Sequence, residues 1–164
     1  MFDPEVLALA ESVLAECRAR GWRIATAESS TGGLIAAALI AIAGASDVFE
    51  RGFVTYSNKA KVELLGVSEA MLATQGAVNA ETATAMAEGA VARAPVDVAV
   101  SITGIAGPGG ASAEKPVGLI FVGVARRGGA GRSERYVFPG DRTSVREAAL
   151  RRALELLLAE AKVH

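Results

Sequence analysis

The sequence is short of the residues that most often carry catalysis or bind metals. Its 164 residues include one cysteine and one histidine, and aromatic residues make up only 5%. One cysteine cannot form an internal disulfide, and one cysteine and one histidine are too few for a His/Cys metal site. The histidine, His164, is the last residue, where chains usually fray, so we expect no histidine-based triad and no bound metal.

An excess of charge of either sign is also missing. The chain has 17 Lys and Arg residues against 18 Asp and Glu residues, and its formal net charge is -1. Arginines recur near the C-terminus, but acidic residues are interspersed among them, which is typical of a solvated helix face. We therefore expect no binding to nucleic acid and none to an anionic membrane.

Long hydrophobic runs are absent as well. The longest apolar run, about residues 34–43, is far too short to span a bilayer. The first residues, MFDPEV, carry acid where a signal peptide needs basic residues, and a helix cap follows at once. The expected location is therefore the cytoplasm.

The apolar residues, 51% of the chain, are arranged in patterns that predict helices alternating with strands in one domain over residues 1–164. Helices are predicted between Asp3 and Gly21, over 32–43, between Ser57 and Gly66, within 67–76, from Asn79 to Arg93 and from Asp141 to Ala161. Strands are predicted over 22–27, 49–56, 96–103, 117–125 and 132–138. The last two strands flank a glycine-rich turn and form a hairpin. We predict an α/β fold with a mixed, mostly parallel sheet that includes this hairpin.

The junction after the first predicted strand carries three hydroxyl side chains in a row. Residues 28–33 read ESSTGG, and one capping residue would suffice for the helix that follows. A serine at a strand-to-helix turn is exposed, and the first N–H groups of the helix can stabilise an oxyanion. The two glycines, Gly32 and Gly33, allow a ligand to approach the backbone closely. A cap is the simpler role for any single one of Ser29, Ser30 and Thr31, but not for all three. We therefore expect one of them to be a nucleophile and the others to act as cap and as oxyanion or ligand donors.

A serine nucleophile needs a base, and without a well-placed histidine the choice is a carboxylate or an amine. If Ser57 caps a helix, Lys61 lies in its opening turns, where the helix dipole disfavours an ammonium and burial would lower the pKa further. Lys59 points elsewhere by helical geometry and is the natural comparison. Glu28 is the competing base, but it adjoins Ser29 at a strand end, so the two side chains would diverge.

Residues 103–110 (TGIAGPGG) form a glycine-rich loop after another predicted strand. Gly104 and Gly109 have the spacing of a phosphate-binding loop, but Gly110-Ala111 stand where Lys-Ser/Thr should be. No G-x-G-x-x-G is present either, so we expect no ATP or dinucleotide cofactor. The loop N–H groups can still bind an anion, and a plain mobile loop fits the sequence equally well. Ligands of open α/β sheets bind beyond the carboxyl ends of strands, where this loop and residues 28–33 lie.

Five motifs occur in order and together cover nearly the whole chain: AESSTGG, FERGFVTYSNKAK, SITGIAGPGG, EKPVG and FPGDRTSVR. Together they resemble the bacterial nicotinamide-nucleotide amidohydrolase (NMN deamidase) family. The domain of this family is also found at the C-terminus of competence/damage-inducible protein A. Any one motif alone would be a weak match, whereas five in order are specific.

The resemblance implies hydrolysis of the carboxamide of nicotinamide mononucleotide to the acid, with release of ammonia, as a step in pyridine nucleotide recycling. It implies a metal- and cofactor-free serine–lysine mechanism with Ser29 as nucleophile and Lys61 as base, while Tyr56 assists proton transfer or orientation. Thr103 and Arg142 would complete the site, and Arg142, near a helix N-terminus, is suited to pair with the substrate phosphate. The implied fold is a three-layer α/β/α sandwich, and members commonly form dimers.

The sequence departs from the family pattern in two respects. Family members often have cysteine after the nucleophilic serine, where this chain has Ser30, and no molybdopterin-binding-like domain precedes the motifs, which suggests the stand-alone form. A second hypothesis is a non-catalytic nucleotide-binding or regulatory module linked to competence or the DNA-damage response. The intact Ser29, Tyr56 and Lys61 argue against it, because a binding module has little need for all three.

Overall fold

The structure is a computed structural model that describes residues 1–163; the expectation about His164 concerns a residue outside this range. Its elements, in chain order, are α1 (Pro4–Arg20), β1 (Ile24–Glu28), α2 (Leu34–Ile40), a 3-10 turn η1 (Ala45–Asp47), β2 (Phe49–Val54), α3 (Asn58–Leu65), α4 (Glu69–Gln75), α5 (Ala80–Arg93), β3 (Val98–Gly104), β4 (Leu119–Arg126), β5 (Arg132–Val137) and α6 (Arg142–Lys162). Among these residues no helix is long and apolar enough to cross a bilayer.

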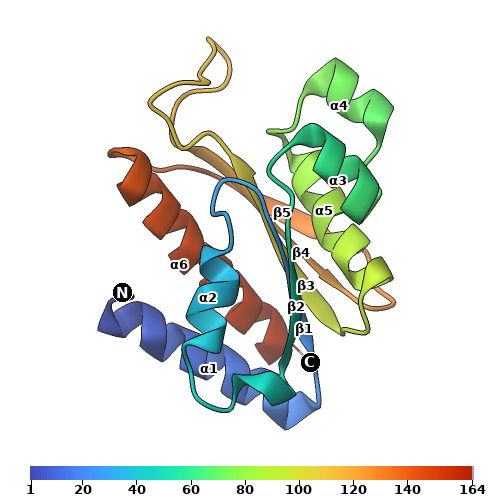
Figure 1. Ribbon diagram of the computed structural model, residues 1–164, viewed down its shortest axis with the longest axis vertical. Helices are drawn as coiled ribbons and strands as arrows, with labels where there is room; N and C mark the ends of the chain where they lie inside the picture. The colour runs from blue at the N-terminus through green and yellow to red at the C-terminus, as the bar shows by residue number, and fades with distance from the viewer. Residues whose placement is uncertain (164) are drawn as a thin grey trace.

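The five strands form one mixed sheet in the order β2-β1-β3-β4-β5. β1 pairs in parallel with β2 and β3, whereas β4 runs antiparallel to both β3 and β5. Helices α1, α2 and α6 cover one face of the sheet, and α3, α4 and α5 cover the other (Figure 1). The predicted three-layer α/β/α fold with a mixed sheet and a terminal hairpin is confirmed.

Both faces of the central strands are buried, which explains their nearly continuous apolar sequence. Every residue of β1 is buried, and so are six of the seven residues of β3. One face packs against Val, Leu and Ile side chains of α1, α2 and α6, and the other against the alanine-rich α5. The small residues of α5 let its neighbours approach closely: a Cβ added at Gly89 would lie 2.0 Å from the Leu65 carbonyl oxygen. This contact seats α3 against α5.

The helix predicted over 32–43 is shorter in the structure, and this is the main difference in element bounds. α2 begins only at Leu34 because Gly32 and Gly33 both adopt left-handed backbone angles, with φ of 58° and 103°. It ends at Ile40, and the chain then turns through η1 into β2. The two glycines therefore belong to a loop between β1 and α2, which is the loop that carries the candidate nucleophile.

Candidate active site

The carboxyl ends of β1, β2 and β3 lie at one edge of the sheet because these strands are parallel, and a cavity of about 280 Å³ opens beside them. Seven of the ten predicted site residues line this cavity, whereas Thr31, Gly32 and Gly33 do not. The lining consists of Ser29, Ser30, Tyr56, Asn58, Lys61, Ala77, Val78, Thr103, Gly104, Ala106 and Arg142.

Ser29 and Lys61 are in direct contact at the buried end of this cavity. The Lys61 Nζ lies 3.0 Å from the Ser29 Oγ, and the two residues are only 1% and 8% exposed. Nζ also donates to the backbone carbonyls of Thr55, at 2.9 Å, and Tyr56, at 3.1 Å. The amine is therefore held at three points, one of which is the serine hydroxyl.

The surroundings of Lys61 make its neutral form more accessible than that of an exposed lysine. Burial lowers the pKa of the Lys61 amine to about 8, because the interior penalises the charged form. A neutral amine has two N–H donors and one lone pair, and the carbonyls of Thr55 and Tyr56 provide two acceptors. The lone pair is then left for the hydroxyl proton of Ser29. When Lys61 is protonated, all three N–H groups have acceptors, so the amine can hold or release a proton in the same position.

Local sequence places Lys61 at this point. The Ser57 hydroxyl caps α3 by accepting from the Ala60 N–H at 3.0 Å, which makes Lys61 the fourth residue of the helix. Lys61 faces the sheet, whereas the side chain of Lys59 is 83% exposed and lies 3.8 Å from Glu63. Lys59 thus points away from the site, as its helical position predicts.

Glu28, whose role the sequence leaves open, caps α2. Its carboxylate is fully buried and accepts four hydrogen bonds: from the Thr31 hydroxyl at 2.7 Å and from the N–H groups of Gly33 (3.2 Å), Ile35 (3.0 Å) and Ala36 (3.1 Å). The expectation that Ser30 and Thr31 cap the helix is therefore wrong. A carboxylate at the strand end reaches over the loop, where it meets the positive end of the helix dipole.

This cap also corrects the expected set of oxyanion donors. The first N–H groups of α2 bind Glu28 and are not available to a ligand. Within the loop, the Gly32 N–H donates to the Ser29 carbonyl at 3.1 Å. The backbone N–H groups of Ser30 and Thr31 have no acceptor within residues 1–163. They follow Ser29 directly, which is where an oxyanion donor is needed.

We expect Glu28→Gln to lower the free energy of unfolding by about 1–3 kcal/mol, because an amide group would face buried N–H donors that need an acceptor. Urea denaturation of the purified chain measures this loss. Glu63→Gln is the matched control: the Glu63 side chain is 60% exposed and forms an ion pair with Lys59 at the surface, so the change in its free energy of unfolding should stay within about 0.5 kcal/mol. Equal stabilities for the two variants would contradict the capping role of Glu28.

Tyr56 contacts the lysine through its backbone and not through its ring. Its side chain is exposed, and its hydroxyl lies 3.5 Å from Arg142 Nη2. No hydrogen bond within residues 1–163 joins this phenol to Ser29 or Lys61. Proton transfer by the phenol, which the family resemblance implies, thus has no contact to support it here. A role in orienting Lys61 is supported by a contact, the hydrogen bond from Lys61 Nζ to the Tyr56 carbonyl.

The other predicted residues shape the walls of the cavity. The buried Thr103 hydroxyl donates to the Ala77 carbonyl at 2.8 Å and fixes the segment that carries Val78. Gly104 lies against β4, where an added Cβ would come within 2.4 Å of the Ile120 side chain. Arg142, at the start of α6, donates to the Gly107 carbonyl at 2.8 Å and so ties the glycine-rich loop to the cavity rim.

Sequence reasoning missed several residues at this site. Asn58, Ala77, Val78 and Ala106 line the cavity, but small apolar residues and an exposed amide carry no distinctive signal in a single sequence. The Ser30 hydroxyl is buried without a hydrogen-bond partner beside the nucleophile. Arg146 was also missed: it reaches the same loop from α6, and its only sequence signal is its position one helical turn after Arg142.

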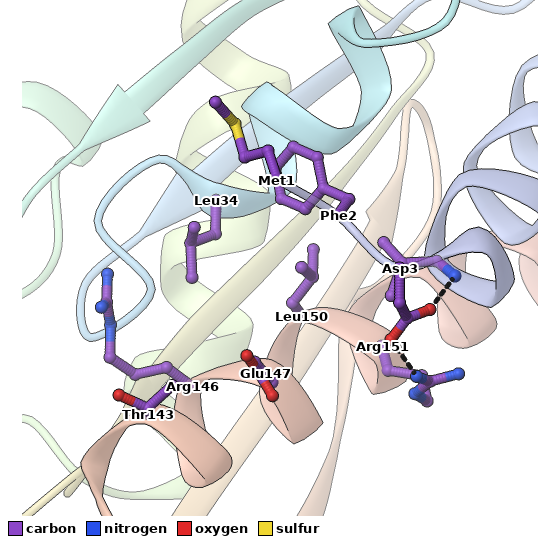
Figure 2. A pocket seen from close by; sticks show the side chains of 10 residues that line it. Met1, Phe2, Asp3, Leu34, Thr143, Arg146, Glu147, Leu150 and Arg151 are labelled. Carbon is purple, nitrogen blue, oxygen red and sulfur yellow. Dashed lines mark hydrogen bonds and ion pairs between the residues drawn. The ribbon is translucent and has the colours of Figure 1, made fainter.

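A second cavity, of about 170 Å³, lies between the N-terminal segment and α6 (Figure 2). Leu34 and Leu150 form part of its apolar wall, and Asp3 and Arg151 form an ion pair at its edge. Thr143 is the one hydroxyl residue of its lining, and no hydrogen bond within residues 1–163 joins that hydroxyl to a base. Arg146 lines this cavity and also contacts the loop that carries Ser29. The two cavities share no lining residue.

The fold and the site together define a class of protein: three-layer α/β/α domains that carry a buried serine–lysine pair at the ends of the parallel strands. Within this class, the chain belongs to the CinA C-terminal domain family, whose model matches residues 6–161. The resemblance predicted from the five motifs is confirmed.

Relatives of known name match the chain over nearly its whole length. It is 49% identical over 157 residues to the nicotinamide-nucleotide amidohydrolase PncC of Escherichia coli K12, covering 96% of this chain and 95% of that protein. It is 53% identical over 148 residues to a CinA-like protein of Syntrophobacter fumaroxidans, of which it spans only 35%. The crystal structure of the competence/damage-inducible protein CihA from Agrobacterium tumefaciens superposes with a TM-score of 0.94 at 47% identity, covering 97% of both chains.

Proposed function

We propose that the chain hydrolyses the carboxamide of nicotinamide mononucleotide to nicotinate mononucleotide and ammonia, by a Ser29–Lys61 mechanism. The observation that carries this proposal is the 3.0 Å contact between the Ser29 hydroxyl and a buried amine whose pKa is lowered to about 8. The names of full-length relatives, nicotinamide-nucleotide amidohydrolase, support the substrate. Such an activity would recycle pyridine nucleotides, because it converts nicotinamide mononucleotide into nicotinate mononucleotide, which can be used again in their synthesis.

In the first half of the reaction, Lys61 takes the hydroxyl proton of Ser29 as Oγ attacks the carboxamide carbon. The carbonyl oxygen becomes an oxyanion, which the N–H groups of Ser30 and Thr31, without an acceptor within residues 1–163, can stabilise. The tetrahedral intermediate collapses when the protonated Lys61 gives its proton to the amide nitrogen. The C–N bond breaks, ammonia leaves, and an ester joins the acyl group to Ser29.

In the second half, a water molecule takes the place of ammonia. Lys61, neutral again, accepts a proton from this water as the water oxygen attacks the ester carbon. The second oxyanion uses the same donors, and its collapse breaks the bond to Ser29 Oγ, which recovers its proton from Lys61. Amide and water are thus converted into acid and ammonia, and the dyad returns to its starting state.

The remaining walls of the cavity suit the rest of the substrate. Ala77, Val78 and Ala106 give a small apolar surface for the flat face of a pyridinium ring. With Lys61 neutral, as the reaction requires, Arg142 is the charged residue of the lining, and its positive charge favours a substrate that carries a phosphate. Arg142 lies at the rim, where its guanidinium can pair with phosphate oxygens.

We expect kcat/KM to rise with pH and to level off above about pH 8. Lys61 must be neutral to accept the Ser29 proton, and its pKa is lowered to about 8, so the active fraction grows as the pH passes this value. Initial rates of ammonia release between about pH 6 and 10 measure the profile. A flat or falling profile across this range would contradict Lys61 as the base.

The function itself is tested by an assay of ammonia release from a panel of amides, with nicotinamide mononucleotide, its riboside and free nicotinamide side by side and a chelator present. We expect the mononucleotide to be the best substrate. Binding of the mononucleotide without release of ammonia would instead support the second hypothesis, a nucleotide-binding module. Release from the panel without preference would contradict the assigned substrate.

A further inference from the structure

Arg146 is a half-buried residue that contacts the nucleophile loop and has no role in the reaction described above. Its side chain extends from α6 to the loop between β1 and α2 (Figure 2). There Nε donates to the Ser30 carbonyl at 3.0 Å and Nη2 donates to the Thr31 carbonyl at 3.2 Å. These are the two residues that directly follow Ser29.

The contact fixes the direction of the peptide group between Ser30 and Thr31. This peptide is trans, so its carbonyl and its N–H point in opposite directions. Because the Ser30 carbonyl is held by Arg146, the Thr31 N–H must face away from α6. That N–H is one of the two donors of the loop that have no acceptor within residues 1–163.

Two side chains of opposite charge hold this loop. Glu28 binds the Thr31 hydroxyl and the first N–H groups of α2, whereas Arg146 binds carbonyls only. No carboxylate within the described chain forms an ion pair with Arg146, so its charge is directed at the loop. A cation on a carbonyl strengthens the N–H of the same peptide as a donor.

Arg146 differs in this respect from the other arginines of α6. Arg142 lies at the cavity rim, where it donates hydrogen bonds to the Gly107 carbonyl and the Tyr56 hydroxyl. Arg151 pairs with the carboxylates of Asp3 and Glu5 at the surface. Arg152 pairs with the carboxylates of Glu134 and Glu155. Only Arg146, among these four, forms hydrogen bonds with the loop of the nucleophile.

We propose that Arg146 is a positioning residue that holds the Ser29–Thr31 loop so that the N–H groups of Ser30 and Thr31 stabilise the oxyanion. The inference rests on the proposed function for its substrate but not for its geometry. An oxyanion forms whenever Ser29 is acylated or phosphonylated, whichever substrate the chain takes. Arg146 acts through the loop and touches no reacting atom.

The test compares Arg146→Met and Arg146→Lys with Arg151→Met, a control on the same helix that keeps clear of the loop. For Arg146→Met we expect kcat for the mononucleotide to fall by about 10²-fold while KM stays close to that of the wild type, because an oxyanion donor acts mainly in the transition state. Lysine has a single nitrogen for two carbonyls, so Arg146→Lys should lie between Arg146→Met and the wild type. Arg151→Met should match the wild type.

A second readout does not depend on the amide substrate. A fluorophosphonate probe reacts with an activated serine by forming a bond from Oγ to phosphorus and expelling fluoride, through a similar anionic transition state. We expect its rate of labelling at Ser29 to fall in Arg146→Met in parallel with kcat, with the pH dependence set by Lys61 unchanged. If the probe labels Ser29 but the chain releases no ammonia, the proposed function fails, and the labelling rates still test the role of Arg146.

Several results would overturn the inference. They are an unchanged kcat and labelling rate in Arg146→Met, a loss confined to KM, or an equal loss in Arg151→Met. If Arg146→Met loses its cooperative thermal unfolding transition, Arg146→Lys decides: a folded lysine variant with the activity and labelling rate of the wild type overturns the proposal. A wild-type chain that neither releases ammonia nor labels at Ser29 overturns both proposals.

Discussion

Ser29→Ala is expected to lower ammonia release from nicotinamide mononucleotide by about four orders of magnitude or more, with the fold intact. The change removes the nucleophile of the reaction. Within residues 1–163, no other hydroxyl group forms a hydrogen bond with the Lys61 amine. Initial rates at saturating substrate measure the loss. Circular dichroism and the thermal midpoint show whether the fold survives.

Ser30→Ala is the matched control for this result, since Ser30 is the next residue in the same loop. Its hydroxyl is buried and has no hydrogen-bond partner within residues 1–163, Lys61 included. We expect Ser30→Ala to lose no more than about tenfold, the cost of one contact to the substrate. A loss of activity in Ser30→Ala as large as that in Ser29→Ala would leave the nucleophile unassigned. Full activity in Ser29→Ala would exclude Ser29 as the nucleophile.

Lys61→Met is expected to have the second largest effect, a loss of about 10³-fold or more in kcat/KM, because Ser29 then has no base. Methionine preserves most of the length of the side chain. Lys59→Met is the control two residues away: the Lys59 side chain is 83% exposed and its amine lies 3.8 Å from the Glu63 carboxylate, so the activity of this variant should match that of the wild type. Comparable losses in the two variants would mean that the dyad is wrongly assigned.

Lys61→Met should also remove a rise in stability with pH that the wild type shows, a readout that is independent of activity. The folded-state pKa of Lys61 is about 8, below its ordinary value of 10.5, so below about pH 8 the folded chain holds a buried ammonium. Between these two values the unfolded chain binds more protons, and stability therefore rises with pH. Urea denaturation at about pH 7 and pH 10 should show this rise in the wild type and not in Lys61→Met. Equal pH dependence in both would contradict a lowered pKa.

Much of this structure could be predicted from the sequence because local patterns decide it. β1 and β3 are recognisable as apolar runs of strand length, and α1, α3 and α6 carry their caps in the sequence, at Asp3, Ser57 and Asp141. Lys61 could be separated from Lys59 because helical periodicity alone places them on different faces. The dyad was thus within reach of residue chemistry and spacing, and the family resemblance selected Ser29 among three hydroxyls.

The parts that could not be predicted depend on contacts between distant segments or on small shifts of the backbone. Glu28 was set aside as a base because its side chain diverges from Ser29, and for the same reason it can reach over the loop to α2. Arg146 meets the Ser30 carbonyl from 116 residues away. The Tyr56 ring could not be placed from the sequence, since its strand and turn fix the backbone carbonyl and leave the side chain exposed.

The most direct test of the account is to trap the ester on Ser29 during turnover. Wild-type chain is mixed with nicotinamide mononucleotide, quenched with acid after milliseconds to seconds, digested and analysed by mass spectrometry. The account predicts a nicotinate mononucleotide acyl group on Ser29 that forms before the acid product and disappears as the substrate is consumed. Ammonia release with Ser29 unmodified throughout, or with the acyl group on Ser30, would contradict it.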